Sequence, residues 1–292
     1  MYELNILDNS TASAYEWMTF PSYKYLLHIL DTDNTIVAIG ATNNQQPVGL
    51  VLAQMVQDRI VVIFSIFVAI EERNKGIGTA LLTRIQAELQ DRGCKILQLN
   101  YTTGKPTTVA LERVIEKCNW TPPETRTLVC KGEAKRIIEA NWIRRYSRLP
   151  SSYSIFPWEE ITPEERQIIQ QQQQTQPWIP EDLVPFKYED NLEPLNSIGL
   201  RYQGQVVGWL INHRIAPHTI RYTCSFVRED LQKMGRIIIL YAEACERQIK
   251  ANIPNAIWTV PSFHQSMVSF VKNHWLPYLN AVEESRGTLK LI

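Results

Sequence analysis

Residues 66–82 read IFVAIEERNKGIGTALL and join an apolar strand, a short polar turn and the start of an amphipathic helix. Apolar residues at helical spacing after Gly76 indicate the helix. Backbone N–H groups at a helix start have no intrahelical partner, and the helix dipole favours negative charge there. Glycine at positions 76 and 78 removes the side chains that would keep a phosphate away from the backbone. The stretch therefore predicts a cradle for a pyrophosphate.

The segments on either side of this stretch predict a mixed fold. Strands are expected at residues 4–7, 35–41, 48–55, 60–68, 96–101 and 125–130, and helices at residues 11–30, 76–89 and 107–118. Polar residues separate the three strands before the turn, which is typical of an antiparallel meander. A dinucleotide-binding fold is the competing interpretation, but the pattern G-x-G-x-x-G is absent and the strands before the turn do not alternate with helices. The fold class expected is α+β.

The second half of the chain repeats the first half. The correspondence falls on four pairs with one common separation along the chain: Gly40 and Gly199, Gly49 and Gly208, Val68 and Val227, Gly76 and Gly235. An internal duplication explains this pattern, and a chain of 292 residues is long enough for two domains. We expect domains at residues 1–131 and 151–292, each a mostly antiparallel twisted sheet flanked by helices, and a helical linker at residues 132–150.

Composition limits the classes of partner. The 30 basic residues equal the 30 acidic residues in number, so no overall field attracts nucleic acid or anionic lipid. The five cysteines lack metal-ligand spacing, and their odd number indicates reduced thiols. The first residues show no signal-peptide pattern. We expect a cytoplasmic protein, a monomer or homodimer, with no metal site and no membrane partner.

The turn Arg73–Gly78, directly after an apolar strand, resembles motif A of the GNAT superfamily, Q/R-x-x-G-x-G/A. The resemblance implies that acetyl-CoA is a co-substrate, with its pyrophosphate on the backbone amides of the turn and its pantetheine arm along the strand. The cofactor-binding residues implied in this way are Ile66, Phe67, Val68, Arg73, Asn74, Lys75, Gly76, Ile77, Gly78 and Thr79. Asn119-Trp120 stands where the family usually has Gly-Phe.

The same resemblance implies an N-acyltransferase that brings an amine and a thioester together for direct attack. The acceptor is expected to be a small-molecule or peptide amine. The side-chain acid and base of many relatives are missing, because Ile115 stands at the usual tyrosine position and Val62 near the usual glutamate position. Tyr101, at the end of the next strand, is a candidate proton donor, with simple packing as the competing interpretation.

The second half departs further from the motif. Its turn keeps Gln232 and Gly235 but has Ile237 where the second small residue belongs, and this β-branched side chain is expected to crowd a pyrophosphate. The second domain is therefore expected to be a degenerate scaffold. His213, Tyr222 and Cys224 are candidates to face a cleft, or else core or surface residues. Two alternatives stay open: a non-catalytic acyl-CoA-binding or interaction protein, and catalysis in the C-terminal half.

Overall fold

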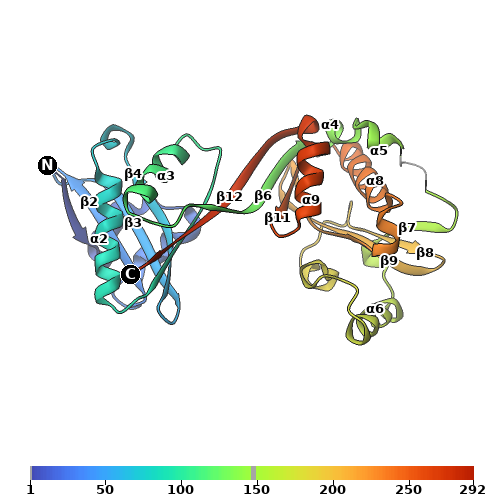
Figure 1. Cartoon of the computed structure of the whole chain (residues 1–292), viewed down its shortest axis with the longest axis horizontal. Helices are drawn as coiled ribbons and strands as arrows, with labels where there is room; N and C mark the ends of the chain where they lie inside the picture. Colours follow the sequence, from blue (N-terminus) through green and yellow to red (C-terminus); the bar gives the residue numbers. More distant parts are fainter. Residues whose placement is uncertain (1, 146–148) are drawn as a thin grey trace. The chain divides into compact units, whose positions relative to one another are not determined.

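The computed structural model describes residues 2–145 and 149–292 (Figure 1). By their contacts the residues form two compact units, here called unit 1 (Met1–Arg126 with Glu284–Ile292) and unit 2 (Thr127–Glu283). The predicted domain boundaries at residues 131 and 150 stay predictions, and residues 146–148 of the expected linker lie outside the described residues. No helix in the described ranges is long and apolar enough to cross a membrane.

Unit 1 contains a mostly antiparallel sheet with the strand order β1-β2-β3-β4-β5-β12, in which β4 and β5 pair in parallel. Its strands are β1 (Tyr2–Ile6), β2 (Ile36–Asn43), β3 (Gln46–Gln57), β4 (Ile60–Val68), β5 (Ile96–Thr102) and the end of β12 (Leu279–Leu291). Its helices are α1 (Asn9–Ala12), α2 (Ile77–Asp91) and α3 (Thr108–Lys117), with 3₁₀ helices η1 (Ser13–Met18), η2 (Pro21–His28) and η3 (Ile70–Glu72).

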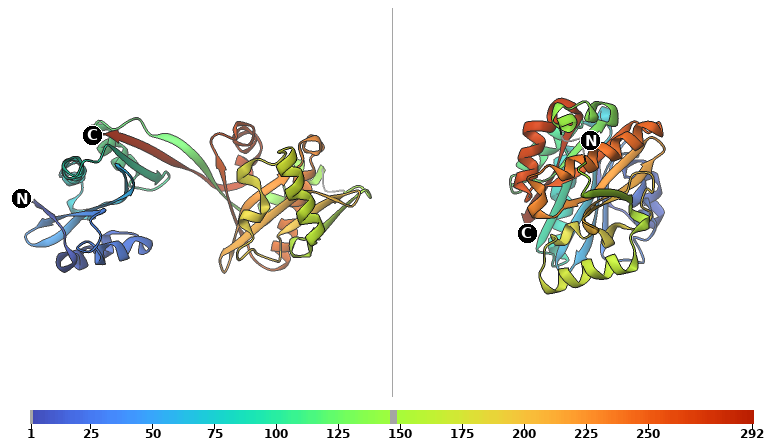
Figure 2. Two further views of the ribbon diagram at one scale, coloured as in Figure 1. Left: turned by 90° about the horizontal axis from the view of Figure 1, so that it is seen from below. Right: turned by 90° about the vertical axis from the view of Figure 1, so that its right-hand side faces the viewer.

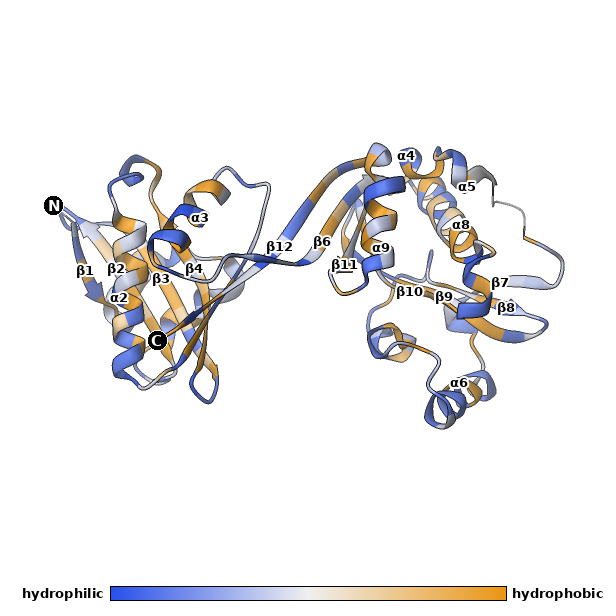
Figure 3. Ribbon diagram, in the orientation of Figure 1, coloured by the Kyte–Doolittle hydropathy of each residue, from blue (hydrophilic) through white to orange (hydrophobic). Residues whose placement is uncertain are grey.

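Both faces of this sheet are buried. Along β3, Val51 packs with α2 and α3, whereas the neighbouring residues Leu50 and Leu52 pack with α1, η1 and η2 on the other face. A sheet covered on both faces needs apolar residues on both sides of each strand. Figure 3 accordingly shows β3 and β4 hydrophobic along much of their length.

The predicted helix at residues 11–30 is wrong, because the segment forms α1 followed by two 3₁₀ helices. Asp8 caps α1, and its side chain accepts a hydrogen bond from the backbone N–H of Thr11 at 2.9 Å. Thr19 is extended, and Pro21 occupies the first turn of η2. A proline in that position cannot continue a preceding helix, since it lacks the N–H and restricts the residue before it.

Unit 2 repeats the arrangement with the strand order β11-β10-β9-β8-β7. Its strands are β7 (Tyr153–Pro157), β8 (Ile198–Tyr202), β9 (Gln205–Ala216), β10 (Thr219–Val227) and β11 (Asn255–Pro261). Its helices are α4 (Ala134–Ile138), α5 (Asn141–Arg145), α6 (Pro163–Thr175), α7 (Glu229–Gln232), α8 (Arg236–Lys250) and α9 (Gln265–Phe270). Shorter turns of helix are η4 (Trp158–Glu160), η5 (Glu181–Leu183), η6 (Pro185–Tyr188), η7 (Val271–Trp275) and η8 (Leu276–Tyr278). Figure 2 shows α6 and α8 on opposite sides of these strands.

The last strand of each half belongs to the sheet of the other half. The sequence predicted that residues 125–130 close the first domain, but Thr127–Glu133 of β6 (Glu124–Glu133) pair antiparallel with β11 in unit 2. In unit 1, Ser285–Leu291 of β12 pair antiparallel with all of β5. The prediction failed because a strand's own sequence specifies its two faces and not the strand that it pairs with.

The internal duplication extends to individual contacts. A Cβ atom added to Gly40 would overlap the ring of Tyr15, and one added to Gly199 would overlap the ring of Phe156. Both glycines therefore accommodate an aromatic ring on the same face of equivalent strands. Since neither glycine has a positive φ, the close approach of the ring is what requires glycine at these positions.

We expect Gly40→Ala to destabilise the protein by about 1–3 kcal/mol, because the buried Tyr15 ring must leave its packing position. Gly199→Ala should do the same in unit 2, where Phe156 is buried. Urea unfolding measures both effects. Gly78→Ala is the matched control, because its added Cβ would meet its nearest neighbours at ordinary contact distances of 3.5 and 3.8 Å. Equal stabilities for all three variants would contradict the packing argument.

Candidate functional site

The candidate site begins where β4 and β5 separate. The two strands pair in parallel only from Ile60 to Ile63 on β4 and from Ile96 to Leu99 on β5. On its other edge β4 stays paired with β3 as far as Val68. Beyond Ile63, therefore, one edge of β4 has no strand beside it among the described residues.

Backbone alternation decides which groups lie on this open edge. The N–H of Ala69 donates to the carbonyl oxygen of Val48 on β3 at 2.8 Å. In an antiparallel pair, alternate residues direct both backbone groups toward the partner strand. Phe67 therefore faces β3, whereas Ile66 and Val68 direct their backbone groups to the open edge. Consistent with this, the carbonyl oxygen of Val68 accepts a hydrogen bond from Nε of Arg73 at 3.1 Å.

The turn after β4 brings the start of α2 to the same edge. Asn74 and Gly76 have φ values of 63° and 83°, in the left-handed region that favours glycine and asparagine. Gly76 caps α2 without a side-chain hydrogen bond, and its carbonyl oxygen accepts from the N–H of Ala80 at 3.0 Å. The amides of Ile77, Gly78 and Thr79 precede this bond, so the helix itself provides them with no acceptor.

The space around Gly76 is open. A Cβ on Gly76 would have the hydroxyl of Tyr2 as its nearest neighbour, at 4.0 Å. Beside the turn, Glu72 accepts hydrogen bonds from Lys75 at 3.0 Å and Asn43 at 3.3 Å. The bond from Lys75 is the main cause that lowers the pKa of Glu72. These residues fit a pyrophosphate, because an uncapped helix start with no side chain in front of it is a ready-made anion site.

Tyr101 lies on β5 and donates a hydrogen bond from its hydroxyl to Oε1 of Glu112 on α3, at 2.8 Å. Arg286 of β12 donates to the same oxygen at 2.8 Å. Burial, followed by the hydrogen bond to Glu112, raises the pKa of Tyr101 to about 12. Ile115 is buried in the core beneath α3. Ile115, at the family's usual tyrosine position, is therefore a core residue. The hydroxyl of Tyr101, the alternative proton donor, is already hydrogen-bonded to Glu112.

Comparison with known proteins shows what the first unit is similar to. Residues 2–120 match the profile of the acetyltransferase (GNAT) family. The match covers less than half of the chain. No curated protein matches the chain in sequence.

Solved structures extend the GNAT likeness to the whole chain. A tandem GNAT protein from the clavulanic acid biosynthesis pathway aligns over 100% of this chain and 98% of its own, with a TM-score of 0.59 and 11% identity. A GCN5-related N-acetyltransferase from Sphaerobacter thermophilus aligns over 99% of this chain and 95% of its own, with a TM-score of 0.55 and 13% identity. A glucosamine N-acetyltransferase region of a fungal multi-domain β-N-acetylglucosaminidase aligns over 100% of this chain and 38% of that one, with a TM-score of 0.53 and 15% identity. The predicted fold class, two tandem GNAT-like domains, is confirmed.

The second GNAT-like unit keeps the framework of the motif. Nε2 of Gln232 donates to the carbonyl oxygen of Val227 at 2.8 Å, as Arg73 does to Val68 in unit 1. Gly235 caps α8 with a φ of 68°. Ile237, in the first turn of α8, packs against the main core of unit 2 and lines a cavity. The cavity has a volume of about 460 Å³.

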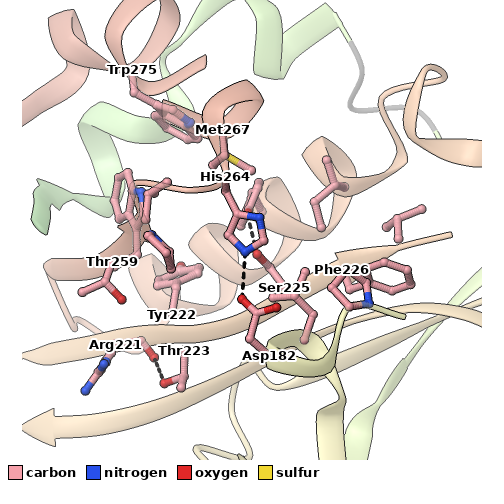
Figure 4. A pocket seen from close by; sticks show the side chains of 18 of the residues that line it. Asp182, Arg221, Tyr222, Thr223, Ser225, Phe226, Thr259, His264, Met267 and Trp275 are labelled. Carbon is pink, nitrogen blue, oxygen red and sulfur yellow. Dashed lines mark hydrogen bonds and ion pairs between the residues drawn. The ribbon is translucent and has the colours of Figure 1, made fainter. Parts of the chain in front are cut away.

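Of the three side chains predicted to face a cleft in this half, Tyr222 lines the cavity. Cys224 lies in the core on the other face, where burial raises its pKa to about 12. His213 lies outside the lining and shares a hydrogen bond of 2.7 Å with the hydroxyl of Thr223. Sequence reasoning missed Asp182 and His264, which share a hydrogen bond of 2.8 Å in the wall of the cavity (Figure 4). They are far apart in the chain, and no motif links them.

Proposed function

We propose that this chain is an acyl-CoA-dependent N-acyltransferase that transfers an acetyl group from acetyl-CoA to a primary amine in a ternary complex. The observation that carries the proposal is the meeting of two features of unit 1. The open edge of β4 at Ile66 and Val68 lies directly before the uncapped start of α2 at Gly76. The match of residues 2–120 to the profile of an acetyltransferase family supports the same activity.

The binding roles follow from the backbone groups that remain available. The amides of residues 77–79 would hold the pyrophosphate, with Arg73 fixing the turn to the strand through its bond to Val68. Asn74 and Lys75 shape the turn, the first through its positive φ and the second through its bond to Glu72. The pantetheine amides would pair with Ile66 and Val68 along the open edge, as an added strand does.

Catalysis at such a site would rest on positioning and on a backbone donor. A backbone N–H on the open edge of β4 can donate to an oxyanion as the amine attacks the thioester carbon. The C–N bond forms, the C–S bond breaks, the nitrogen gives its proton to water, and the CoA thiolate departs. A thiol has an ordinary pKa of about 8.5, so its anion is a tolerable leaving group at neutral pH.

The direct test measures CoA release from acetyl-CoA in the presence of a panel of primary amines. Release that depends on the amine, with formation of the N-acetyl product, supports the enzyme. Tight binding of CoA without turnover of any amine would favour the alternative of a non-catalytic acyl-CoA-binding protein.

The five cysteines are buried and form no disulfide, which is consistent with the cytoplasmic location that we propose.

We expect Tyr101→Phe to keep kcat within about tenfold of the wild-type value, because a hydroxyl with a pKa of about 12 is a poor donor to a thiolate. The measurement compares kcat and CoA affinity of the two proteins on an amine that proves active. A larger loss of kcat with unchanged CoA affinity would instead restore Tyr101 as the general acid. Glu112→Gln is the matched variant, since it keeps an acceptor for the tyrosine hydroxyl and removes the charge.

A further inference from the structure

The turn between β4 and α2 carries no net charge. Its carboxylates are Glu71 and Glu72, which follow the strand almost at once. Its cations are Arg73 and Lys75, one for each carboxylate. Phosphate groups gain most from cations that are free to pair with them. The two carboxylates therefore oppose, by their charge, the pyrophosphate that this turn is proposed to hold.

Glu72 is held at the turn by two hydrogen-bond donors. Nζ of Lys75 donates to its Oε2 at 3.0 Å, and Nδ2 of Asn43 donates to its Oε1 at 3.3 Å. The bond from Lys75 is the main cause that lowers the pKa of Glu72, so the carboxylate is charged at neutral pH. The positive charge of Lys75 is thereby balanced within the turn itself.

Two routes of contact place this carboxylate beside the start of α2. Lys75 directly precedes Gly76, the residue that caps the helix. From the other side, Asn43 pairs with Tyr2 across β2 and β1. The hydroxyl of Tyr2 is in turn the nearest neighbour of a Cβ built on Gly76, at 4.0 Å. A pyrophosphate on the amides of residues 77–79 would therefore bind beside a fixed negative charge.

We propose that Glu72 is a counter-charge that limits the affinity of the turn for the pyrophosphate of acyl-CoA and so speeds the release of CoA after transfer. The inference rests on the proposed function and concerns the regulation of the same site. In the free protein, a negative charge near the N-terminus of α2 is favourable because of the helix dipole. When the ligand binds, the same charge repels it. Weaker binding mostly means faster dissociation, and product release limits turnover in many enzymes.

The test removes the charge and keeps the hydrogen bonds. Glu72→Gln retains an oxygen that can accept from Lys75 and Asn43. In calorimetry at low salt we expect this variant to bind CoA about three- to tenfold more tightly than the wild-type protein, and in stopped flow to release it more slowly by a similar factor. Glu71→Gln is the matched control, because it makes the same change at the adjacent, exposed residue. It should change the affinity by less than about twofold, since an exposed charge is screened.

Two further measurements separate the charge of Glu72 from a structural role. Pantetheine, which has no phosphate, should bind to Glu72→Gln and to the wild-type protein equally. The gain in CoA affinity should also shrink with added salt, because the Debye length falls from about 10 Å at 0.1 M to about 3 Å at 1 M. Without CoA, the variant should be no more stable to urea than the wild-type protein, since the carboxylate favours the start of α2.

The outcomes distinguish this inference from the acyl-CoA site on which it rests. Wild-type or weaker CoA affinity in Glu72→Gln, an equal gain in Glu71→Gln, or a gain for pantetheine as well would overturn the counter-charge alone. A wild-type protein that binds no CoA, or that binds it as well after Gly78→Val, would contradict the site itself and this inference with it.

Discussion

Replacing Gly78 with valine is expected to abolish CoA binding while unit 1 keeps its fold. Gly78 has no positive φ, and a Cβ there would meet Val114 at 3.5 Å and Val68 at 3.8 Å, both ordinary contacts. The backbone therefore accepts a side chain, and valine is no less favourable than glycine in a helix. The two methyl groups of valine would add bulk beside the amides of residues 77–79, where the pyrophosphate is proposed to bind.

Calorimetry with CoA measures the loss directly, and thermal unfolding provides a second measurement. Saturating CoA at a hundredfold excess over Kd should stabilise the wild-type protein by about 2.7 kcal/mol, and this stabilisation should vanish in the variant. Gly78→Ala is the graded control, with a smaller loss of affinity. If folded Gly78→Val binds CoA with wild-type affinity, the pyrophosphate does not lie on this turn.

Gly76 is the less informative position for the same experiment. Its φ of 83° means that any other residue would be held in the left-handed region, at a cost of about 1–2 kcal/mol. A loss of CoA binding in Gly76→Val would therefore have two explanations, a blocked site and a strained helix start. At Gly78 the backbone conformation is ordinary, so this strain does not arise.

The sequence allowed prediction of the elements whose signals are local. The strand at residues 60–68 has the observed bounds, and the helix predicted at 76–89 is observed as Ile77–Asp91. Strand alternation, glycine at the helix start and apolar spacing all act within a few residues. The repeat was recognisable because the structure requires glycine at the same positions in both halves. Gly76 and Gly235 adopt a positive φ, and Gly40 and Gly199 each lie against an aromatic ring.

The features that sequence could not predict depend on contacts between distant residues. The pairing of Asp182 with His264 joins η5 to the residue before α9, and neither segment carries a recognisable motif. The hydrogen bond from Tyr101 to Glu112 changes the chemistry of the tyrosine and depends on the packing of α3. Local sequence also does not specify that β5 pairs with the end of the chain.

That last pairing leads to the second large effect: deletion of Glu284–Ile292 is expected to unfold unit 1. The deletion removes the strand on one edge of β5, so the backbone groups of Ile96–Thr102 on that edge lose their partners. It also removes Lys290, which donates to the carbonyl oxygens of Cys118 and Asn119 after α3 at 3.1 and 2.9 Å. Several hydrogen bonds of about 1 kcal/mol each are a large part of a usual stability of about 5–15 kcal/mol.

Hydrogen exchange should therefore show lost protection across β3, β4 and β5, together with lost CoA binding, whereas β9 of unit 2 stays protected. A synthetic peptide of residues 279–292 added in trans is the control, because it supplies the missing strand and should restore part of the protection. Substitution of Leu291, an exposed side chain at the end of β12, should have little effect by comparison. A truncated protein that keeps its protection in β5 and its affinity for CoA would mean that unit 1 is complete without the C-terminal strand.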